Sequence, residues 1–291
     1  MTKSSGIALR IEPATKDLGE FMVRRTLPDR RRQRVGPFIF FDHMGPADFA
    51  PGSGVNVRAH PHVGLATITY LFAGEILHRD SLGCVQPIRP GEVNWMTAGK
   101  GIVHSEKVRE EVLASGQHLH GIQTWVALPV EHEDTDPRFE HYAADDIPNL
   151  SQDGVEICVI IGTAFGVTSP VQTESETLYV ELRMDAGSSL PLPQTEELAV
   201  YVVDGEVTVD AETLAPFELA ILEDNAAATI AAKSAAHVML CGGATLDGDR
   251  VVWWNFVSSS RERLEQAKKD WNEGRFEPVP GETDFIPLPY T

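Results

Sequence analysis

The sequence predicts an all-β protein of two similar antiparallel barrels followed by one short helix. Short apolar or alternating runs, separated by glycine and proline turns, recur along most of the chain, as is typical of antiparallel strands. The second half also repeats the first: 67–77 and 198–209 each read as a strand, a Gly-Glu turn and a strand, and 88–96 resembles 214–222. Such internal similarity indicates a duplicated barrel.

The chain has 291 residues, which suits two domains of ordinary size. The stretch 131–148 is acidic, contains prolines and has few apolar residues, so it is the best domain boundary. We therefore predict a first barrel at 1–132, a linker at 133–148 and a second barrel at 149–291.

Individual strands follow from the apolar runs and the turns that bound them. In order, the expected strands are 35–44, 55–73 (an edge or irregular strand where it contains Pro61), 76–81, 84–88, 93–97, 102–106, 121–129, 155–162, 178–184, 198–203 and 207–209. Near the end, Ser260 is expected to cap a helix at 261–271, with Leu264, Ala267 and Trp271 on one face. The proline-bearing tail after it should be extended.

The charge balance excludes some partners. With 43 acidic against 24 basic residues and a net charge of -19, the chain repels phosphate backbones and anionic lipids, so direct nucleic-acid binding is not expected. No apolar stretch of membrane-spanning length and no signal peptide is visible, which predicts a soluble, cytoplasmic protein. We also expect it to be a monomer.

Two further features concern cysteines and arginines. Cys84, Cys158 and Cys241 are widely spaced and form no C-x-x-C pattern, so we expect neither disulfides nor a thiolate zinc site. A basic run interrupts the acidic chain at Arg24, Arg25, Arg30, Arg31, Arg32 and Arg34. It reads either as a solvated turn or guarded strand edge, or as a contact for an anion or a partner protein.

Pairs of ligand-type side chains stand at period two in the first barrel. His60 and His62 flank a proline, and His104 and Glu106 flank a serine. Residues at i and i+2 of a strand point to the same face, so each pair aims together. Two such pairs facing each other across a small barrel would form a mononuclear metal site.

Other histidines have weaker claims to this site. His43 ends an apolar strand, and His118 and His120 form a third pair that could compete for the metal or line a pocket. His78 and Asp80 share a strand face and read as a structural pair. In the second barrel, leucines and prolines at 190–193 stand where the first has His60 and His62, so we predict no metal there.

Several segments together resemble the pirin family of the cupin superfamily, over nearly the whole chain. They are 59–62, 69–70, 74–75, 78–83, 90–92, 95–99, 101–106, 119–121, 125–126, 147–148 and 253–260. The resemblance implies two tandem cupin domains, each a jelly-roll-like β-barrel, with iron held in the first by His60, His62, His104 and Glu106. Where the general cupin pattern has a glutamate, four residues after the second histidine, this chain has Ala66.

The resemblance also implies a function: opening of the ring of a flavonol such as quercetin with O2 at Fe(II), as a quercetin 2,3-dioxygenase-like oxidoreductase. The substrates would be a small aromatic compound and O2, with Glu106 as the catalytic base and Phe40 and Trp95 lining an apolar entrance. The ligand types would also accept Mn, Co, Ni, Cu or Zn. Two alternatives stay open: an iron-dependent redox sensor that binds a transcription factor or a metabolic enzyme, and a metal that only stabilises the barrel.

Overall fold

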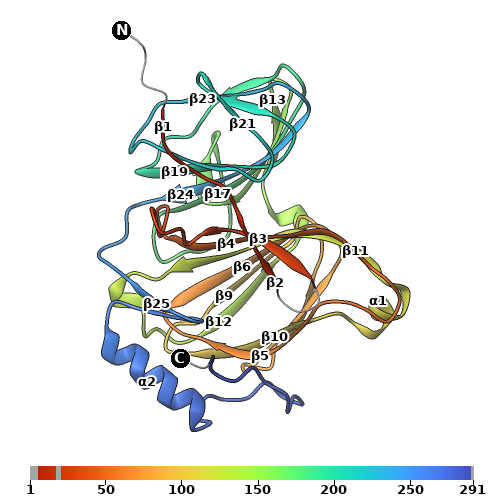
Figure 1. Ribbon diagram of the computed structural model, residues 1–291, viewed down its shortest axis with the longest axis vertical. Helices are drawn as coiled ribbons and strands as arrows, with labels where there is room; N and C mark the ends of the chain where they lie inside the picture. Colours follow the sequence, from red (N-terminus) through yellow and green to blue (C-terminus); the bar gives the residue numbers. More distant parts are fainter. Residues whose placement is uncertain (1–5, 18–20, 290–291) are drawn as a thin grey trace. The chain divides into compact units, whose positions relative to one another are not determined.

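The computed structural model describes residues 6–17 and 21–289 and divides the chain into two compact units. One, here called the aliphatic unit, comprises the segment ending at Thr15, Arg24–Phe41 and Asp145–Thr245. The other, the histidine unit, comprises the segment ending at Val23, Asp42–Ala144 and the chain from Leu246 onward. Strands dominate both units, which confirms the all-β fold class (Figure 1).

The aliphatic unit contains a seven-stranded sheet in the order β1-β22-β19-β24-β17-β14-β13, a four-stranded sheet in the order β18-β23-β20-β21, and the pair β15-β16. Its strands are β1 (Ile7–Ile11), β13 (Asn149–Gln152), β14 (Val155–Ile161), β15 (Thr163–Ala164), β16 (Val167–Thr168), β17 (Thr177–Met184), β18 (Ser189–Pro191), β19 (Glu197–Asp204), β20 (Val207–Val209), β21 (Glu212–Leu214), β22 (Leu219–Leu222), β23 (Thr229–Ala232) and β24 (Ala236–Gly243). Aliphatic side chains from both larger sheets fill one core. Leu190 and Leu192, which correspond in sequence to His60 and His62, lie within that core.

The histidine unit has the matching pair of sheets, in the orders β12-β9-β6-β11-β4-β3-β2 and β5-β10-β7-β8, and the pair β25-β26. Its strands are β5 (Asn56–His62), β6 (Leu65–Ala73), β7 (Ile76–Asp80), β8 (Val85–Ile88), β9 (Val93–Thr97), β10 (Ile102–Lys107), β11 (Gln117–Ala127), β12 (Arg138–Tyr142), β25 (Val251–Trp253) and β26 (Phe256–Ser258). The unit boundary falls inside β2 (Ala14–Asp17), β3 (Met22–Leu27) and β4 (Phe38–Phe49). Antiparallel double sheets of this kind match the jelly-roll expectation.

The interior of the histidine unit contains both apolar and polar side chains. Its apolar cluster includes Met44, Leu71, Ile76 and Leu119, which come from both sheets. Buried polar side chains occupy the remainder, among them the histidines of β5, β7 and β10. This contrast with the aliphatic unit is what distinguishes two otherwise similar folds.

The division of the chain differs from the predicted boundaries at three places. Strand β1 pairs with β22 and so joins the aliphatic unit rather than the first barrel. The predicted linker contains β12, which pairs with β9, and Glu133, whose buried carboxylate forms an ion pair with Arg250, with Oε1 2.7 Å from Nε. Helix α2 (Arg261–Asn272) and the tail belong to the histidine unit instead of the second barrel. All three depend on pairing across long sequence separations, which local composition does not reveal.

Helix α2 confirms the predicted cap and face. Ser260 Oγ accepts a hydrogen bond from Arg263 N at 3.3 Å, and Leu264 and Ala267 are buried in a cluster that Trp271 also contacts. Figure 1 shows α2 beside the β25-β26 hairpin. A second helix, α1 (Glu110–Ser115), was not predicted; it follows β10 and is short. Within the described residues, 3₁₀ turns are present at Val130–His132 and Ala144–Asp146.

The extended tail packs against the outer faces of β5 and β10. Ile286 N donates to Ala59 O at 2.8 Å, and Glu282 accepts from Ser105 Oγ at 2.7 Å and from Lys107 Nζ at 2.8 Å. Ala59 and Ser105 are the chain neighbours of His60 and His104. The tail therefore supports the two strands that carry the candidate ligands from behind.

The arginine run is largely engaged within the aliphatic unit. Arg32 Nη2 lies 3.0 Å from Glu197 Oε1, and that buried carboxylate also accepts from Gly36 N at 2.6 Å. The guanidinium groups of Arg24 and Arg25 lie over the rings of Phe217 and Phe40, at 4.1 and 4.2 Å from the ring centroids. These contacts favour the structural interpretation of the run, so the regulatory alternative rests on the family resemblance alone.

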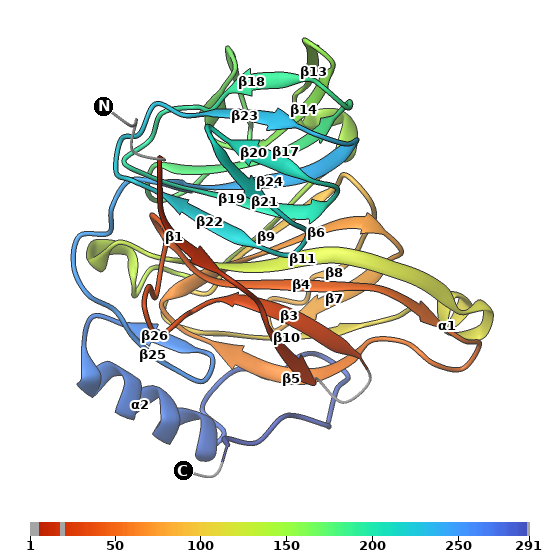
Figure 2. The same cartoon turned by 45° about the horizontal axis from the view of Figure 1, so that its top comes forward.

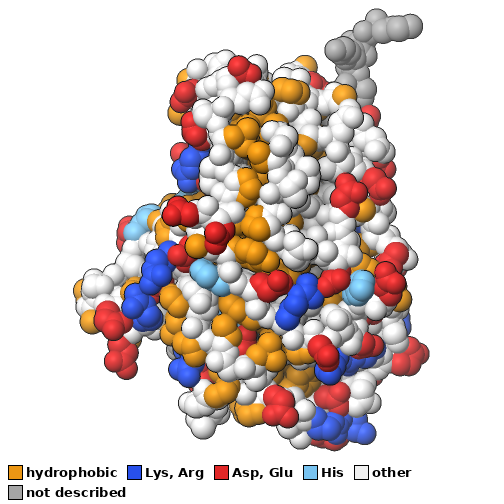
Figure 3. All heavy atoms as spheres, turned by 180° about the vertical axis from the view of Figure 1, so that it is seen from behind, with side chains coloured by type: hydrophobic (Ala, Val, Ile, Leu, Met, Phe, Trp, Pro, Cys, Tyr) orange, Lys and Arg blue, Asp and Glu red, His pale blue; other side chains and the backbone are white. Residues whose placement is uncertain are grey.

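The distribution of surface charge and the burial of the cysteines agree in part with what the composition predicts. Figure 3 shows acidic side chains spread over the face in view, with lysines and arginines among them. Cys158 and Cys241 are buried, whereas Cys84 is half-buried. No helix in the described ranges combines the length and the apolar character needed to cross a membrane.

Candidate metal centre

Two neighbouring antiparallel strands bring three histidines together. In the register of β5 and β10, His104 stands opposite His60, and His62 stands opposite Ile102 at the end of β5. Alternation along each strand turns His60, His62 and His104 to the interior of the unit, while Ala59, Val103 and Ser105 face the tail. Figure 2 shows the two strands side by side.

Gly64 allows the chain to leave β5 directly after His62. Its φ is +72°, and a Cβ at this position would lie 1.9 Å from Val257 O. Gly64 N donates to Gly99 O at 2.9 Å, and Gly64 O accepts from Leu128 N at 3.2 Å. A residue with a side chain would meet both a strained backbone and a steric clash here. This glycine therefore fixes the end of the strand that carries two ligands.

The three histidines form one compact, buried group. One ring nitrogen from each lies within 4.8 Å of those of the other two. The ring centroids are 4.4 Å apart for His60 and His104 and 5.0 Å apart for the other two pairs. The exposed fractions are 6%, 1% and 2% for His60, His62 and His104. The sequence-based grouping of these three residues agrees with this geometry.

Burial keeps these imidazoles neutral. Desolvation lowers the pKa of His60 to about 4, although its ring also contacts the carbonyl of Arg58. Burial likewise holds the pKa values of His62 and His104 well below the ordinary value for histidine. Neutral imidazole is the form that binds metal, so no proton has to be displaced near neutral pH.

The unpaired nitrogens show that a metal would fit. His60 Nδ1 lies 2.8 Å from Arg58 O, which leaves its Nε2 available. Among the described residues, His62 Nδ1 and His104 Nε2 are buried without a hydrogen-bond partner. A buried nitrogen without a partner costs free energy, and a divalent cation bound by these two nitrogens together with His60 Nε2 would remove that cost. The donor set suits Fe(II) and other transition metals.

Glu106 lies on the same face of β10 but outside the three-histidine group. Thr69 Oγ1 is 3.5 Å from Glu106 Oε1 and 2.8 Å from Gln123 Oε1. Burial raises the pKa of Glu106 to about 7, and the hydrogen bond from Thr69 opposes this as the smaller of the two effects. In the metal-free protein, burial therefore favours the protonated form of this carboxyl group more than it would for an exposed glutamate.

This raised pKa predicts how the stability of the metal-free protein depends on pH. The unfolded chain loses this proton near pH 4.5 and the folded chain near pH 7, so the free energy of unfolding should fall with rising pH between these values, by about 3 kcal/mol. Glu106→Gln removes this dependence. Denaturant titrations of both proteins should therefore diverge from pH 4.5 to pH 8, with the variant becoming the more stable. Parallel curves would contradict the raised pKa.

The comparison with the variant is needed because the lowered pKa values of the histidines change the free energy of unfolding with pH in the opposite direction to Glu106. The pKa of His60 is lowered from 6.5 to about 4, so its stabilising contribution is complete above pH 6.5 and is lost as the pH falls toward 4. Wild type and Glu106→Gln share this loss. Their difference at each pH therefore reports Glu106.

The third histidine pair faces away from the candidate site. Leu119 and Gln123 of β11 face the interior, so alternation puts His118 and His120 on the opposite face of the sheet. His120 Nε2 lies 2.7 Å from His43 Nε2, and His118 Nδ1 lies 2.7 Å from Asp48 Oδ1. Period two shows that two side chains share a face, but it does not show which face.

Other residues around the site were not found from the sequence. Thr67 and Thr69 interrupt the apolar strand β6 at period two, a signal of a polar interior that could have identified them. Trp125 lies edge-on to His62, with ring centroids 5.1 Å apart. By alternation Ala66 lies on the other face of β6, so its lack of a carboxylate leaves the site unchanged.

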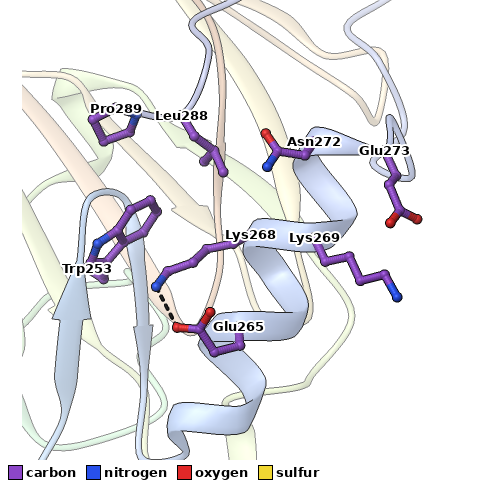
Figure 4. A pocket seen from close by; sticks show the side chains of 8 residues that line it. All are labelled: Trp253, Glu265, Lys268, Lys269, Asn272, Glu273, Leu288 and Pro289. Atoms are coloured by element: carbon purple, nitrogen blue, oxygen red, sulfur yellow. Dashed lines mark hydrogen bonds and ion pairs between the residues drawn. The ribbon is translucent and has the colours of Figure 1, made fainter. Parts of the chain in front are cut away.

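The predicted aromatic entrance receives no support. Trp95 is fully buried, with Nε1 donating to Thr97 Oγ1 at 2.9 Å, and Phe40 belongs to the aliphatic unit. The hollow drawn in Figure 4 lies between α2, Trp253 and the tail. Lys268 crosses it, with Nζ 2.6 Å from Glu265 Oε1 and 4.2 Å from the centroid of the Trp253 ring. No candidate ligand lines this hollow.

Comparisons with known proteins agree on one family. A family model described as Pirin matches residues 20–126, and one described as Pirin C-terminal cupin domain matches residues 179–277. A pirin-like protein of Caulobacter vibrioides is 45% identical over 97% of this chain and 99% of its own length. A Pseudomonas aeruginosa protein named "Putative quercetin 2,3-dioxygenase" is 40% identical over 88% of this chain and 80% of its own length.

The fold has close solved counterparts. The crystal structure of a quercetin 2,3-dioxygenase from Acinetobacter baumannii superimposes with a TM-score of 0.90 at 32% sequence identity. The match covers 97% of this chain and 95% of that chain. The similarity thus extends over both compact units.

Proposed function

The chain belongs to the pirin family, and from this premise we propose that it is a metal-dependent dioxygenase that opens the ring of a flavonol such as quercetin with O2. The observation that carries the proposal is the buried group of three neutral histidines with convergent free nitrogens. Relatives and a structural neighbour named as quercetin 2,3-dioxygenases support the reaction class.

We assign His60, His62 and His104 as metal ligands, with Glu106 as the fourth ligand that the family resemblance implies. A bound Fe(II) would supply Lewis acidity and open coordination positions for O2 and a flavonol oxygen. Affinity by itself would favour Cu or Zn over Fe(II), so the choice of Fe(II) rests on the chemistry rather than on the ligands.

Glu106 is the proposed proton acceptor. The 3-hydroxyl group of a flavonol must lose its proton for its oxygen to become a strong donor, and Oε1 of Glu106 would take it. Thr69 Oγ1 donates to Glu106 Oε1 at 3.5 Å, and this contact favours the carboxylate form, which is the form that can accept a proton.

The surroundings keep water away from this step. His62 and His104 are almost fully buried, and Trp125 covers one edge of His62. Electrostatic interactions are stronger where water is excluded, and reactive species are protected from side reactions. In the overall reaction, one flavonol and one O2 give one carbon monoxide and one ring-opened ester, with both oxygen atoms retained in the two products.

The substrate assignment can be tested with a matched pair of flavonols. We expect the Fe(II)-loaded protein to consume quercetin and O2 in equal amounts, and to leave quercetin 3-O-methyl ether unchanged, because the ether has no 3-hydroxyl proton for Glu106 to accept. Oxygen uptake and the loss of flavonol absorbance measure both reactions. Turnover of the ether at the rate of quercetin would contradict the role of the 3-hydroxyl group, and no turnover of any flavonol would overturn the substrate class.

A further inference from the structure

Another histidine, His78, and an aspartate, Asp80, lie beyond His104 on the neighbouring strand β7. Strand β7 is the other neighbour of β10, and Asp80 stands opposite His104 in their register. His78 Nδ1 lies 3.3 Å from His104 Nδ1, and His78 Nε2 lies 3.0 Å from Asp80 Oδ2. The exposed fractions of His78 and Asp80 are 5% and 1%. The three side chains thus form a buried line that ends at a candidate ligand.

The line is held firmly at its far end. Asp80 Oδ1 accepts from the backbone N–H groups of Leu82 and Cys84, at 2.9 and 3.0 Å. The ring of Phe139 stacks on His78, with centroids 4.4 Å apart and an interplanar angle of 21°. Asp80 therefore cannot rotate without losing two hydrogen bonds, and His78 cannot tilt without losing its stacking partner.

These contacts fix the positions of the protons. A carboxylate only accepts hydrogen bonds, so His78 Nε2 must carry the proton that is shared with Asp80. The contact between the two Nδ1 atoms needs one donor and one acceptor, and with the proton of His78 on Nε2 the donor is His104 Nδ1. A neutral His104 with its proton on Nδ1 has its lone pair on Nε2, the nitrogen without a hydrogen-bond partner.

We propose that Asp80 and His78 are positioning residues that select the metal-binding tautomer of His104. Asp80 sets the proton on His78, and His78 in turn sets the proton on His104, so that Nε2 is free to bind a divalent cation. A histidine that binds a metal commonly donates a hydrogen bond from its second ring nitrogen to a residue that orients it. The inference rests on the metal-binding part of the proposed function and does not depend on the substrate.

Asp80→Asn is the sharpest test, because asparagine has nearly the shape of aspartate but moves the proton of each histidine to its other ring nitrogen. The amide oxygen stays with the N–H groups of Leu82 and Cys84, so the amide NH2 faces His78 Nε2. His78 must then carry its proton on Nδ1 and donate to His104, which places the proton of His104 on Nε2. We expect Zn(II) and Co(II) to bind about 10- to 100-fold more weakly, measured by competition with a chromophoric chelator.

Three further variants separate this role from simple loss of structure. Asp48→Asn removes the carboxylate that contacts His118. Because His118 is not a candidate ligand, this variant should leave metal affinity unchanged. His78→Asn keeps an acceptor oxygen near the position of Nδ1 and should retain most of the metal affinity. His78→Phe keeps the stacking on Phe139 but has no acceptor for His104, so its metal affinity should fall. Thermal unfolding of each metal-free protein checks that the fold is retained.

A spectroscopic measurement reads the tautomer directly. In the Zn(II)-loaded wild type, long-range proton–nitrogen NMR correlations should show His104 protonated at Nδ1 and His78 at Nε2. Wild-type affinity in Asp80→Asn, or the other tautomer of His78 in the wild type, would overturn the inference while leaving the proposed function intact. Absence of metal binding by the wild type would overturn both.

Discussion

Replacing His104 with alanine is expected to weaken binding of Zn(II) or Co(II) by about 100-fold or more and to reduce flavonol turnover to that of the metal-free protein. Removal of a direct ligand should exceed the roughly 10- to 100-fold effect of changing a residue that only orients one. His104 is an integral part of the group, because the centroid of its ring lies 4.4 Å from that of His60 and 5.0 Å from that of His62. Competition with a chelator and metal analysis of the purified variant measure the loss.

His118→Ala is the matched control. His118 is a histidine of the same unit, but its Nδ1 contacts Asp48 and its side chain lies on the outer face of its sheet. The control should bind metal and turn over flavonol as the wild type does. Equal losses in both variants would mean that general destabilisation, rather than loss of a ligand, explains the effect.

Glu106→Gln is expected to lower the turnover number by roughly 100- to 10,000-fold at saturating metal, the usual range for loss of a general base. The amide has nearly the shape of the carboxyl group but cannot accept the proton of the 3-hydroxyl group. Turnover has to be compared at equal metal content, because Glu106 is also the proposed fourth ligand. Initial rates of quercetin loss under these conditions measure the effect.

A buried carboxylate elsewhere provides the control for this variant. Glu181 has an exposed fraction of 7%, lies in the aliphatic unit and is 2.8 Å from His237 Nε2. Glu181→Gln should leave turnover per bound metal unchanged. If Glu106→Gln keeps the wild-type turnover number while metal affinity falls, Glu106 is a ligand and not the base.

The grouping of His60, His62 and His104 was predictable from the sequence because strand geometry has a short period. His60 and His62 had to share a face, as did His104 with Glu106, and a duplicated strand order made a barrel the natural way to bring the pairs together. The same reasoning identified His78 and Asp80 as a pair. It could not show that β7 lies next to β10, and so it missed the contact of His78 with His104.

The predicted boundaries had a different weakness, since they relied on local composition. The acidic, proline-bearing stretch after β11 reads as a linker, yet β12 within it completes a sheet edge against β9. Strand β1 is separated from its partner β22 by about two hundred residues of sequence, and no local pattern specifies such a pairing. The role of Glu133 as a buried partner of Arg250 was hidden for the same reason.

The central claim is that one metal ion, held by His60, His62 and His104, is required for flavonol oxygenation. The most direct test is an anaerobic titration of the metal-free protein with Fe(II), followed by measurement of the initial rate of quercetin loss and of carbon monoxide release in air. The rate should rise in proportion to added Fe(II) and level off at one equivalent per chain, with one carbon monoxide released per flavonol consumed. Turnover that is independent of Fe(II), or no turnover with Fe(II) or any other divalent ion, would contradict the claim.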